Sequence, residues 1–437
     1  MMMKKFAILS ALALCCTAAQ GVEPWTLDSC INYAVEHNIS VKQSKLQHYN
    51  GELELTEAKN AFLPTVQGYA SESFSFGRGL TADNTYANRN TSSTNLGASL
   101  NLPLFQGLRA TRRVAQAKAN LAQLLEQTEA TKDNITLRVI AQYLQVLYTR
   151  ELVDVAEKQI NISKLELERR RTLFDNGKIP ELDLTQAASQ VAQDELSAVS
   201  ARGDARLALV DLAQLLELDM SSPEGQQFDV CSLDTTVTPS IPDADEVWSS
   251  ALRRNHAIEA ARLGVISADK SVSLAKAGYL PTLSFSAGLG SSYYSMKGAR
   301  SESFGQQMKH NFNQSIGFSL SVPIFDAFST RNNVRRAKAN RLNAELTLEQ
   351  TRTETEKAIV QAHTQAITAH QRMQASAVAR NQAEAAMLAV QEKYNFERAT
   401  PTEFETAKNT FYRASSEAVQ ARYEYLLRIR ILEFYAR

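Results

Sequence analysis

The chain has 437 residues, 44% of them hydrophobic, and its 47 Lys and Arg residues balance 47 Asp and Glu residues. This length allows a large core and about three average domains. The charge balance argues against a nucleic-acid-binding protein, which would carry a basic excess. After the N-terminal leader, no stretch reaches the roughly 18 unbroken apolar residues of a membrane-spanning helix.

The first residues predict a cleaved secretory signal peptide. Two lysines at 4–5 form a positive start, "FAILSALALCC" is a short apolar stretch, and "TAAQG" offers small residues for cleavage after Ala19 or Gly21. A lipoprotein acylated at Cys15 or Cys16 is the alternative, although the leucine before Cys15 is large for that position. The signal directs the chain across the inner membrane of a bacterium or into a secretory pathway.

Cys30 and Cys231 are the two cysteines beyond this segment. An oxidising compartment permits one disulfide between them, and two partly buried free thiols are the alternative. Two cysteines provide no disulfide framework from which a fold could be inferred.

The remaining chain contains one unit twice. "AKNAFLPTV" at 58–66 returns as "AKAGYLPTL" at 275–283, and "AKAN" at 117–120 returns at 337–340. Internal repeats take precedence over element-by-element assignment, because they define the architecture. We therefore predict a signal peptide at 1–21, a first repeat at 22–218, a linker at 219–245 and a second repeat at 246–437.

Each repeat begins with a helical stretch, placed at 26–62 in the first, and continues with two alternating segments. "LPTVQGYASESFSFG" and "TNLGASLNLPLF" alternate with period two, as do "LPTLSFSAGLGSSYY" and "QSIGFSLSVPIF". Strict alternation predicts strands, and a polar loop such as "RGLTADNTYANRNTSS" between them predicts a long hairpin. The hairpins are placed at 64–105 and 281–325. One face of the strands is apolar and includes Val66, Phe74, Phe76, Leu96, Leu100, Leu102, Leu283, Phe285, Leu289, Ile316, Phe318, Leu320 and Val322.

A long segment without glycine or proline follows each hairpin. It runs from Leu108 to Asn176 in the first repeat and from Ala327 to Thr400 in the second. Good helix formers dominate both segments. A helix of about 65 residues would be roughly 100 Å long. Ordinary globular helices are much shorter, so the length predicts coiled-coil-like packing.

A sharp turn ends each long helix, at "LFDNGKIPELDL" and at "YNFERATPTEFE". Gly177 suits a left-handed helix cap, and Pro180 suits the start of the next helix. Thr400 and Glu403 have the spacing of a capping box. We therefore predict a second helix after each turn.

Four strands per chain are too few to close a transmembrane barrel, which needs about eight. An open sheet edge cannot lie in lipid, because its backbone groups would go unpaired. Several chains that each donate four strands to one shared barrel would satisfy both constraints.

The duplicated order of an LP-strand, a loop, a strand ending in "PLF" or "PIF", a long helix near "AKAN" and a sharp turn resembles the TolC-like outer-membrane efflux factors. The resemblance covers essentially the whole mature chain. It implies a mainly α fold with β-hairpins, whose trimer forms a 12-stranded transmembrane β-barrel continued by a long periplasmic α-helical barrel. It also places the linker at 219–245 in the equatorial region of that helical barrel.

The same resemblance implies an exit duct in the cell outer membrane that serves a tripartite efflux or type I secretion system. The expected partners are two further copies of the chain, a periplasmic adaptor protein, an inner-membrane pump and outer-membrane lipid. A non-transporting helical scaffold in the periplasm or on the cell surface is the alternative. We expect no enzyme activity, cofactor, metal or nucleic acid, since no HExxH, CxxC, GxSxG or P-loop pattern is present.

The resemblance further implies roles for residues at the predicted turns. Asp183 and Glu403 match acidic positions of a constricted periplasmic entrance, and Asp183 and Tyr394 match a gate latch. As alternatives, Glu403 completes the capping box and Asp183 favours its helix start through the helix dipole. The turns that dock an adaptor would contain Gly177, Lys178, Glu397 and Arg398, although Glu397 replaces the expected glycine and Thr406 replaces a second acidic residue.

Two further patterns carry alternatives. The arginine clusters at 109–113 and 331–336 suit either solvated helix starts or contacts with anionic lipid headgroups. Tyr69, Phe74, Phe76, Tyr293 and Tyr294 suit either ordinary strand packing or an aromatic belt at the membrane surface.

Overall fold

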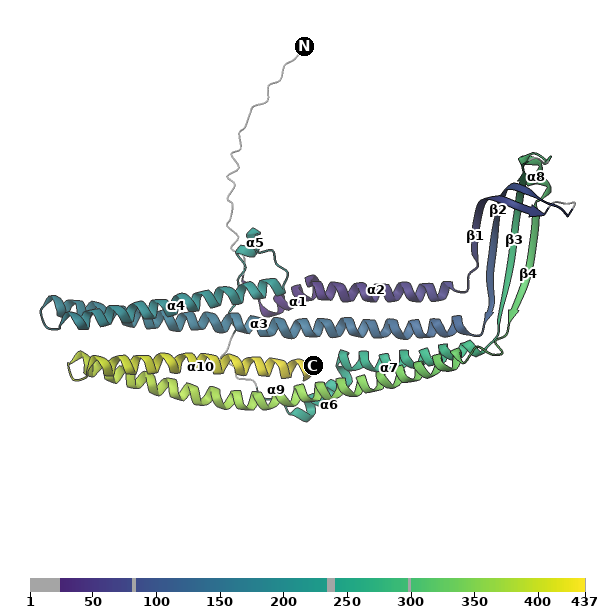
Figure 1. Cartoon of the computed structure of the whole chain (residues 1–437). Coiled ribbons are helices and arrows are strands. Elements are labelled where there is room, and N and C mark those ends of the chain that lie inside the picture. Colours follow the sequence, from purple (N-terminus) through teal and green to yellow (C-terminus); the bar gives the residue numbers. More distant parts are fainter. Residues whose placement is uncertain (1–23, 81–83, 234–239, 298–299, 437) are drawn as a thin grey trace, which may run out of the picture. The chain divides into compact units, whose positions relative to one another are not determined.

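The computed structural model describes residues 24–80, 84–233, 240–297 and 300–436, so the predicted signal peptide lies outside the described residues. The described residues form helices and one four-stranded sheet (Figure 1). They divide into two compact units: the described residues of 1–38, 135–240 and 366–430 form the first, and those of 39–134, 241–365 and 431–437 form the second. Each unit therefore draws residues from both predicted repeats.

Two long helices confirm the segments predicted from the absence of glycine and proline. Helix α3 (Arg109–Asp175) and helix α9 (Ser329–Asn395) each contain 67 residues. After sharp turns, α4 (Glu181–Leu215) folds back along α3, and α10 (Pro401–Ala436) folds back along α9 (Figure 1).

The helical stretch predicted at 26–62 is confirmed, and an asparagine divides it, as one also divides the corresponding stretch of the second repeat. Asn38 separates α1 (Leu27–His37) from α2 (Ile39–Asn60), and its side chain donates to the backbone oxygen of Leu215 at 3.0 Å. Asn255 separates α6 (Ala244–Arg254) from α7 (His256–Ala275), and its side chain caps α7. Asparagine competes with the helix for backbone hydrogen bonds, which explains both breaks.

Short helices fill the connections. Helix α5 (Pro223–Gln226) lies in the predicted linker, the 3₁₀ helix η1 (Lys276–Tyr279) precedes the second hairpin, and α8 (Phe304–His310) lies inside that hairpin's loop. A capping box between Ser303 and Gln306 starts α8. The sequence reading missed α8 because the segment is short and polar.

The predicted linker packs against the start of the chain in the first unit. Trp25 pairs with Val230, the amide of Cys231 donates to Trp25 O at 2.9 Å, and Tyr143 Oη donates to Cys231 O at 2.7 Å. Cys30 is buried and Cys231 is partly exposed, and both are free thiols. Burial, and then the neighbouring Cys231, raise the pKa of Cys30 to about 12, so this thiol stays protonated.

The sheet contains β1 (Thr65–Leu80), β2 (Tyr86–Gln106), β3 (Thr282–Met296) and β4 (Asn313–Ser321), paired antiparallel in that order. Strands β1 and β4 are its two edges. The predicted polar loop of the first hairpin is wrong, because most of its residues extend β1 and β2. Strand β4 ends before Val322, next to Pro323, whose missing N–H cannot continue a ladder.

The register of the sheet confirms the predicted faces. Val66, Leu100, Ala287 and Ile316 form one cross-strand row on the apolar face. The next row, on the other face, contains Gln67, Ser99, Gly288 and Ser315. Because side chains alternate along a strand, the part of the sheet next to the helices has one apolar face and one face of small and polar residues. Farther along β1, Glu72 lies on the same face as Val66 and accepts hydrogen bonds from Ser92 and Thr94.

The same alternation of side chains corrects the prediction that all five aromatic residues suit one belt. Phe74, Phe76 and Tyr293 fall on the apolar face, whereas Tyr69 and Tyr294 fall on the polar face. The ring of Tyr69 lies across Gly97, where an added Cβ would approach its hydroxyl to 2.5 Å. Only three of the five aromatic residues could therefore belong to a belt against lipid.

Four long helices run through the second unit in a row, α2, α3, α7 and α9, with α2 and α9 as its flanks (Figure 1). The contacts that define it are Ser44 Oγ to Thr128 Oγ1 (3.0 Å), Gln116 Nε2 to Ser271 Oγ (2.8 Å) and Arg341 Nη1 to Asp269 Oδ1 (3.7 Å). The helix row thus follows the order of the strands to which it connects.

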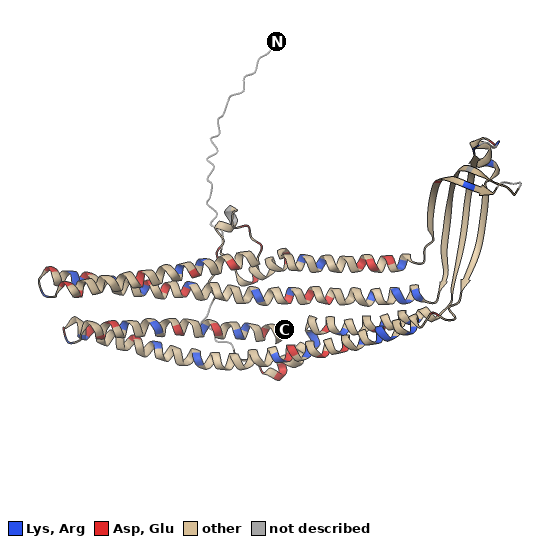
Figure 2. Cartoon of the chain, in the orientation of Figure 1, with Lys and Arg blue, Asp and Glu red and all other residues tan. Residues whose placement is uncertain are grey.

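Lys and Arg residues are frequent where α3 and α9 leave the sheet (Figure 2). In the first cluster, Arg112 donates to the backbone oxygen of Ser273 at 2.7 Å, and Arg113 pairs with Glu57 at 3.1 Å. These two arginines therefore join α3 to both of its neighbours. Contact of the clusters with anionic lipid stays a prediction.

The two faces predict opposite responses to the same charge. The resemblance to an outer-membrane channel places the apolar face against lipid, where a lysine costs about 2–4 kcal/mol at the bilayer midplane. We expect Phe285→Lys to reduce the yield of heat-resistant oligomer in the membrane fraction. The matched control Ser286→Lys places its charge on the polar face and should assemble normally; equal losses from both variants would contradict the two-faced sheet.

Candidate functional site

The concave side of the helix row carries an uncharged polar groove. It lies within the second unit, and none of the described residues that line it is charged. Its polar lining includes Gln43 and Gln47 of α2, Gln127 and Thr131 of α3, and Thr347 and Thr351 of α9. Like the polar face of the sheet, this surface can be wetted without holding an ion in place.

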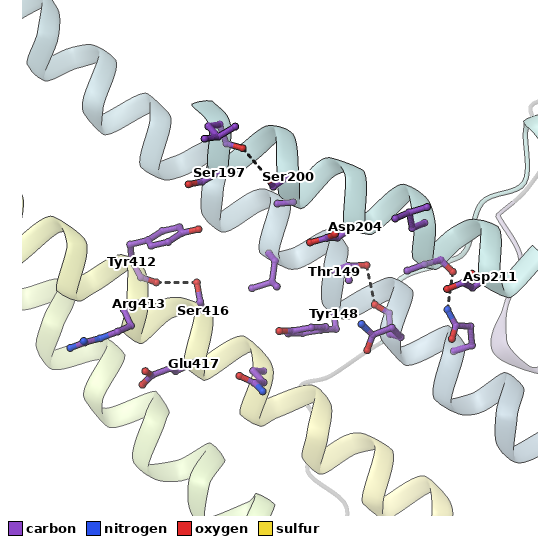
Figure 3. Close-up of a pocket in the computed structure, with 18 residues that line it drawn as sticks. Tyr148, Thr149, Ser197, Ser200, Asp204, Asp211, Tyr412, Arg413, Ser416 and Glu417 are labelled. Atoms are coloured by element: carbon purple, nitrogen blue, oxygen red, sulfur yellow. Dashed lines mark hydrogen bonds between the residues drawn. The ribbon is translucent and has the colours of Figure 1, made fainter. Parts of the chain in front are cut away.

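The first unit has a polar groove of its own, between α3, α4 and α10 (Figure 3). Tyr148 and Thr149 of α3 and Asp204 of α4 line it together with Tyr412 and Glu417 of α10. Unlike the groove of the second unit, it contains charged residues of both signs, since Arg413 also lines it. Both grooves are therefore surfaces suited to water and polar solutes.

The turns at the end of α3 and α9 have the same backbone structure. Gly177 N bonds to Phe174 O and Lys178 N to Leu173 O; at the second turn, Glu397 N bonds to Tyr394 O and Arg398 N to Lys393 O. This pattern is a Schellman motif, which requires a left-handed residue at its centre. Gly177 has a φ of 68° and Glu397 a φ of 58°, so Glu397 adopts the glycine conformation without being a glycine.

Asp183 and Glu403 occupy equivalent first-turn positions of α4 and α10. Glu403 completes the predicted capping box: its carboxylate accepts from Thr400 N at 2.7 Å, and its amide donates to Thr400 Oγ1 at 3.2 Å. The backbone bond from Thr400, followed by the hydroxyl bond, lowers the pKa of Glu403. The carboxylate is therefore ionised at neutral pH and is lost as a cap only when the pH falls through this lowered value.

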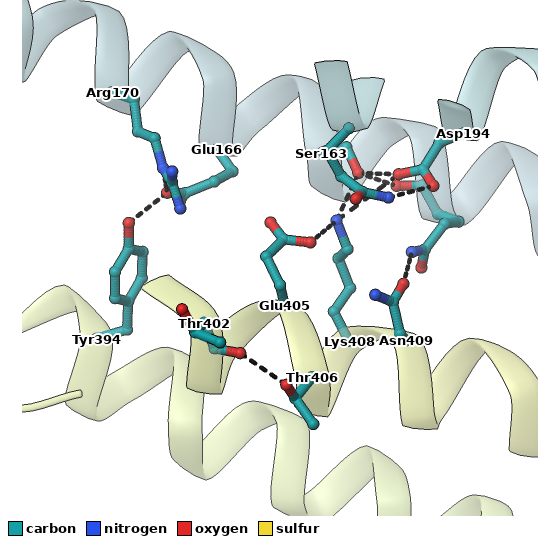
Figure 4. A network of polar contacts seen from close by, with 12 residues as sticks. Ser163, Glu166, Arg170, Asp194, Tyr394, Thr402, Glu405, Thr406, Lys408 and Asn409 are labelled. Atoms are coloured by element: carbon teal, nitrogen blue, oxygen red, sulfur yellow. Dashed lines mark hydrogen bonds and ion pairs between the residues drawn. The ribbon is translucent and has the colours of Figure 1, made fainter. Parts of the chain in front are cut away.

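Tyr394 lies at the centre of a buried cluster near the turns (Figure 4). Its hydroxyl donates to Glu166 Oε1 at 2.5 Å, and Arg170 Nε donates to the same oxygen at 2.8 Å. The guanidinium of Arg169 lies 4.2 Å from the centre of the Tyr394 ring, and Phe404 stacks on it at 5.2 Å. Burial, and then Glu166, raise the pKa of Tyr394 to about 12, so the phenol stays a hydrogen-bond donor.

Asp183 meets this cluster through its backbone. Arg170 Nη1 donates to Asp183 O at 3.1 Å. The predicted latch between Asp183 and Tyr394 stays a prediction, and forming it would require the Tyr394 hydroxyl to exchange Glu166 for Asp183.

A second polar cluster surrounds Lys408, which is 0% exposed (Figure 4). Its Nζ lies 2.6 Å from Glu405 Oε2 and 3.6 Å from Asp194 Oδ2, and it donates to Ser163 Oγ at 2.9 Å. Ser163 also donates to Asp194, whose other oxygen accepts from Gln190 at 3.0 Å. A buried ammonium needs such partners to remain charged.

The sequence reading named Tyr394 as part of a latch but missed the other residues of both clusters, although the repeat itself carries a signal. Tyr394 and Lys408 differ from their counterparts 220 residues earlier, Phe174 and Ala188. In the other repeat, the counterparts of Ser163, Glu166 and Arg170 are Ala383, Ala386 and Val390. A polar residue in one repeat whose equivalent in the other repeat is apolar marks a position where the two repeats have different surroundings.

Within the part of the chain that the structure describes, no group of three or more His, Cys, Asp or Glu residues is arranged to hold a metal ion. None of the helices among these residues combines the length and apolar character needed to cross a membrane.

A sheet with one apolar face, joined to long helices with polar concave surfaces, defines the subunit of a membrane channel. The chain belongs to the outer membrane efflux protein family, whose model matches residues 30–217 and again residues 247–434. Members of this family are channel proteins of the outer membrane, and this is where the chain resides, with a periplasmic helical part.

Two characterised relatives and one solved structure illustrate the likeness. Outer membrane efflux protein BepC of Brucella suis is 23% identical over 319 residues, which are 72% of this chain and 63% of BepC. Outer membrane protein TolC of Escherichia coli is 23% identical over 390 residues, 85% of this chain and 74% of TolC. The structure of outer membrane protein VceC from Vibrio cholerae has a TM-score of 0.75 at 16% identity, covering 94% of this chain and 96% of VceC.

The buried lysine predicts a large difference between two otherwise similar substitutions. Lys408→Ala leaves the buried carboxylate of Asp194 and the partly buried carboxylate of Glu405 without their cation, and it should destabilise the protein by about 3–5 kcal/mol. Lys164→Ala removes an exposed pair with Glu195 and should cost less than about 1 kcal/mol. Thermal unfolding of the purified protein in detergent measures both; similar shifts in midpoint would mean that the Lys408 cluster contributes no more than a surface ion pair.

Proposed function

We propose that three copies of this chain form an exit duct across the outer membrane and the periplasm. Each copy supplies four strands to a shared 12-stranded barrel, continued by a helical barrel whose polar grooves face the lumen. The observation that carries this proposal is the sheet itself. It has an apolar face and a polar face. Among the described residues, each edge strand, β1 and β4, pairs with a strand on one side only.

The predicted division of the chain fits this duct. The repeats at 22–218 and 246–437 would each supply one sixth of the tube, and the linker at 219–245 would lie in its equatorial region. The double match of the family model supports this division.

The duct would receive its substrates from a periplasmic adaptor protein and an inner-membrane pump, in a tripartite efflux or type I secretion system. The name of BepC, an outer membrane efflux protein, supports the efflux role. The adaptor would dock on the two Schellman turns, through Gly177 and Lys178 at the first and Glu397 and Arg398 at the second. Their matching backbone structure would present two equivalent sites per chain.

The periplasmic entrance would be narrowed by Asp183 and Glu403, which three copies would gather into a ring of up to six carboxylates. Glu403 can serve as both cap and ring member, because only one of its oxygens is engaged with Thr400. Tyr394 would hold the entrance closed, bonded to Glu166 within the chain or to Asp183 in the predicted latch.

Native mass spectrometry in detergent tests the assembly and should show three copies. Membrane fractionation tests the runner-up, a non-transporting helical scaffold: a scaffold would be released by salt, whereas a duct stays in the outer membrane until detergent is added. A monomer that stays folded in lipid would contradict the shared barrel.

Single-channel conductance in planar bilayers tests the entrance. A ring of carboxylates favours cations and binds multivalent ones. We expect the double variant Asp183→Asn and Glu403→Gln to lose cation selectivity and block by a trivalent cation. The variant Glu181→Gln, in the same first turn of α4 and two residues before Asp183, is the control. Unchanged selectivity and block in the double variant would leave Asp183 and Glu403 as helix-start residues only.

A further inference from the structure

An exposed apolar ridge, formed by Val322, Ile324, Phe325 and Phe328, lies where β4 passes into α9 at the helix end of the sheet. Ile324 is 95% exposed and Phe325 is 74% exposed, and the other two side chains are exposed as well. Phe325 and Phe328 contact each other edge to face, with 5.4 Å between their ring centres. Four exposed apolar residues within so short a segment are typical of a contact surface rather than of scattered single residues.

The backbone of the ridge is strained. Ala327 and Phe328 have φ values of 51° and 63°, a left-handed conformation that is costly for residues with a Cβ. In the first repeat a glycine, Gly107, stands at the position of Ala327 and avoids this cost. The carboxylate of Asp326 holds the bend, because it accepts a hydrogen bond from the amide of Thr330 at 2.7 Å. Strain that neighbouring contacts maintain in this way is a sign of a functional segment.

Three arginines follow the ridge at the start of α9. Arg331, Arg335 and Arg336 are exposed, and none of them has an anionic partner among the residues that the structure describes. The guanidinium of Arg331 lies 4.1 Å from the centre of the Phe328 ring, which is a cation–π contact. Arg335 lies one turn farther along, on the same face of the helix as Arg331. The apolar ridge therefore continues directly into a stripe of positive charge.

These three arginines are not a copy of the first cluster. Counted 220 residues back, their positions hold Thr111, Ala115 and Gln116 in the first repeat. In the first cluster, Arg112 and Arg113 are engaged within the chain by α7 and α2. The second cluster instead leaves three guanidiniums available for an anionic partner outside the chain.

We propose that this junction binds the headgroups of anionic phospholipids in the leaflet that faces the periplasm. The inference rests on the proposed barrel, in which the apolar face of the sheet meets lipid. The ridge would lie at the edge of the hydrocarbon, where aromatic side chains are favoured. The arginines would lie in the headgroup layer, which is about 5–8 Å thick on each side of a bilayer. Their positive charge complements phospholipids that carry a net negative charge.

The direction of α9 suits this contact. The helix begins at the sheet, and the Cα–Cβ bonds of a helix tilt toward its N-terminus, so the side chains of α9 lean back toward the membrane. From Ser329 to Arg336 the helix rises only about 10 Å. Long arginine side chains can extend along the surface toward the headgroups over part of that distance. Each guanidinium can then donate two parallel hydrogen bonds to a phosphate, which an ammonium group cannot do.

Native mass spectrometry of the detergent-purified protein tests the site, with phosphatidylglycerol and zwitterionic phosphatidylcholine as the probes. The unmodified protein should retain phosphatidylglycerol in preference to phosphatidylcholine. The triple variant Arg331→Gln, Arg335→Gln and Arg336→Gln should bind phosphatidylglycerol at least about tenfold more weakly, because each arginine near an anionic lipid surface adds to the binding. Its binding of phosphatidylcholine should not change.

A matched control removes the same charge elsewhere. The control variant Arg171→Gln, Arg206→Gln and Arg352→Gln changes three exposed arginines on other parts of the helices and should bind both lipids like the unmodified protein. Replacing the three arginines of the site by lysines keeps their charge, so the preference for phosphatidylglycerol should persist with weaker binding.

Several outcomes would overturn the headgroup site. Equal losses from the two glutamine variants would show a general charge effect, and displacement of phosphatidylglycerol by an equal concentration of inorganic phosphate would show a site for free anions. Trimers that dissociate in the site variant alone would show that the arginines bind a neighbouring copy instead. Trimers of the unmodified protein without lipid preference would overturn this inference and leave the duct standing, whereas a monomer would overturn the duct.

Discussion

A sheet edge in lipid leaves its backbone groups without hydrogen-bond partners, and the rest of this structure follows from that constraint. The chain builds four strands with an apolar face that only lipid or another apolar surface can cover, yet β1 and β4 end the sheet on both sides. The proposed barrel of three copies would pair these two edges between neighbouring chains. The helices next to those edges also expose apolar side chains, among them Tyr49 of α2 and Leu342 of α9.

The sequence predicted most of this architecture, because its signals were strong and repeated. Alternation over whole strands determined both faces of the sheet, and the absence of glycine and proline determined α3 and α9. It did not locate the break at Asn38 inside the first helical stretch. It was wrong at "NTYANRNTSS", which reads as a loop although its hydroxyl and amide side chains suit a strand surface exposed to water.

The turns and capping residues were predicted, whereas the buried polar clusters were not. The Schellman and capping signals are local and lie within a few residues of one another. Glu166 and Tyr394, by contrast, meet across more than 200 positions, and Lys408 is indistinguishable in sequence from a solvated helical lysine until the packing places it at 0% exposure. Only the comparison of the two repeats, with Ala188 in the place of Lys408, singles it out.

Duplication also explains why the two copies have diverged where they have. Both carry an arginine cluster after the sheet, and Arg112 and Arg113 of the first cluster contact α7 and α2 within the chain. The second cluster lies on α9, at a flank of the helix row, where the proposed ring would place another copy of the chain. In that ring, each repeat would have one neighbour from its own chain and one from another. The strands of the two repeats would then meet the same lipid and could stay alike, whereas the helices would meet different neighbours and would have to differ.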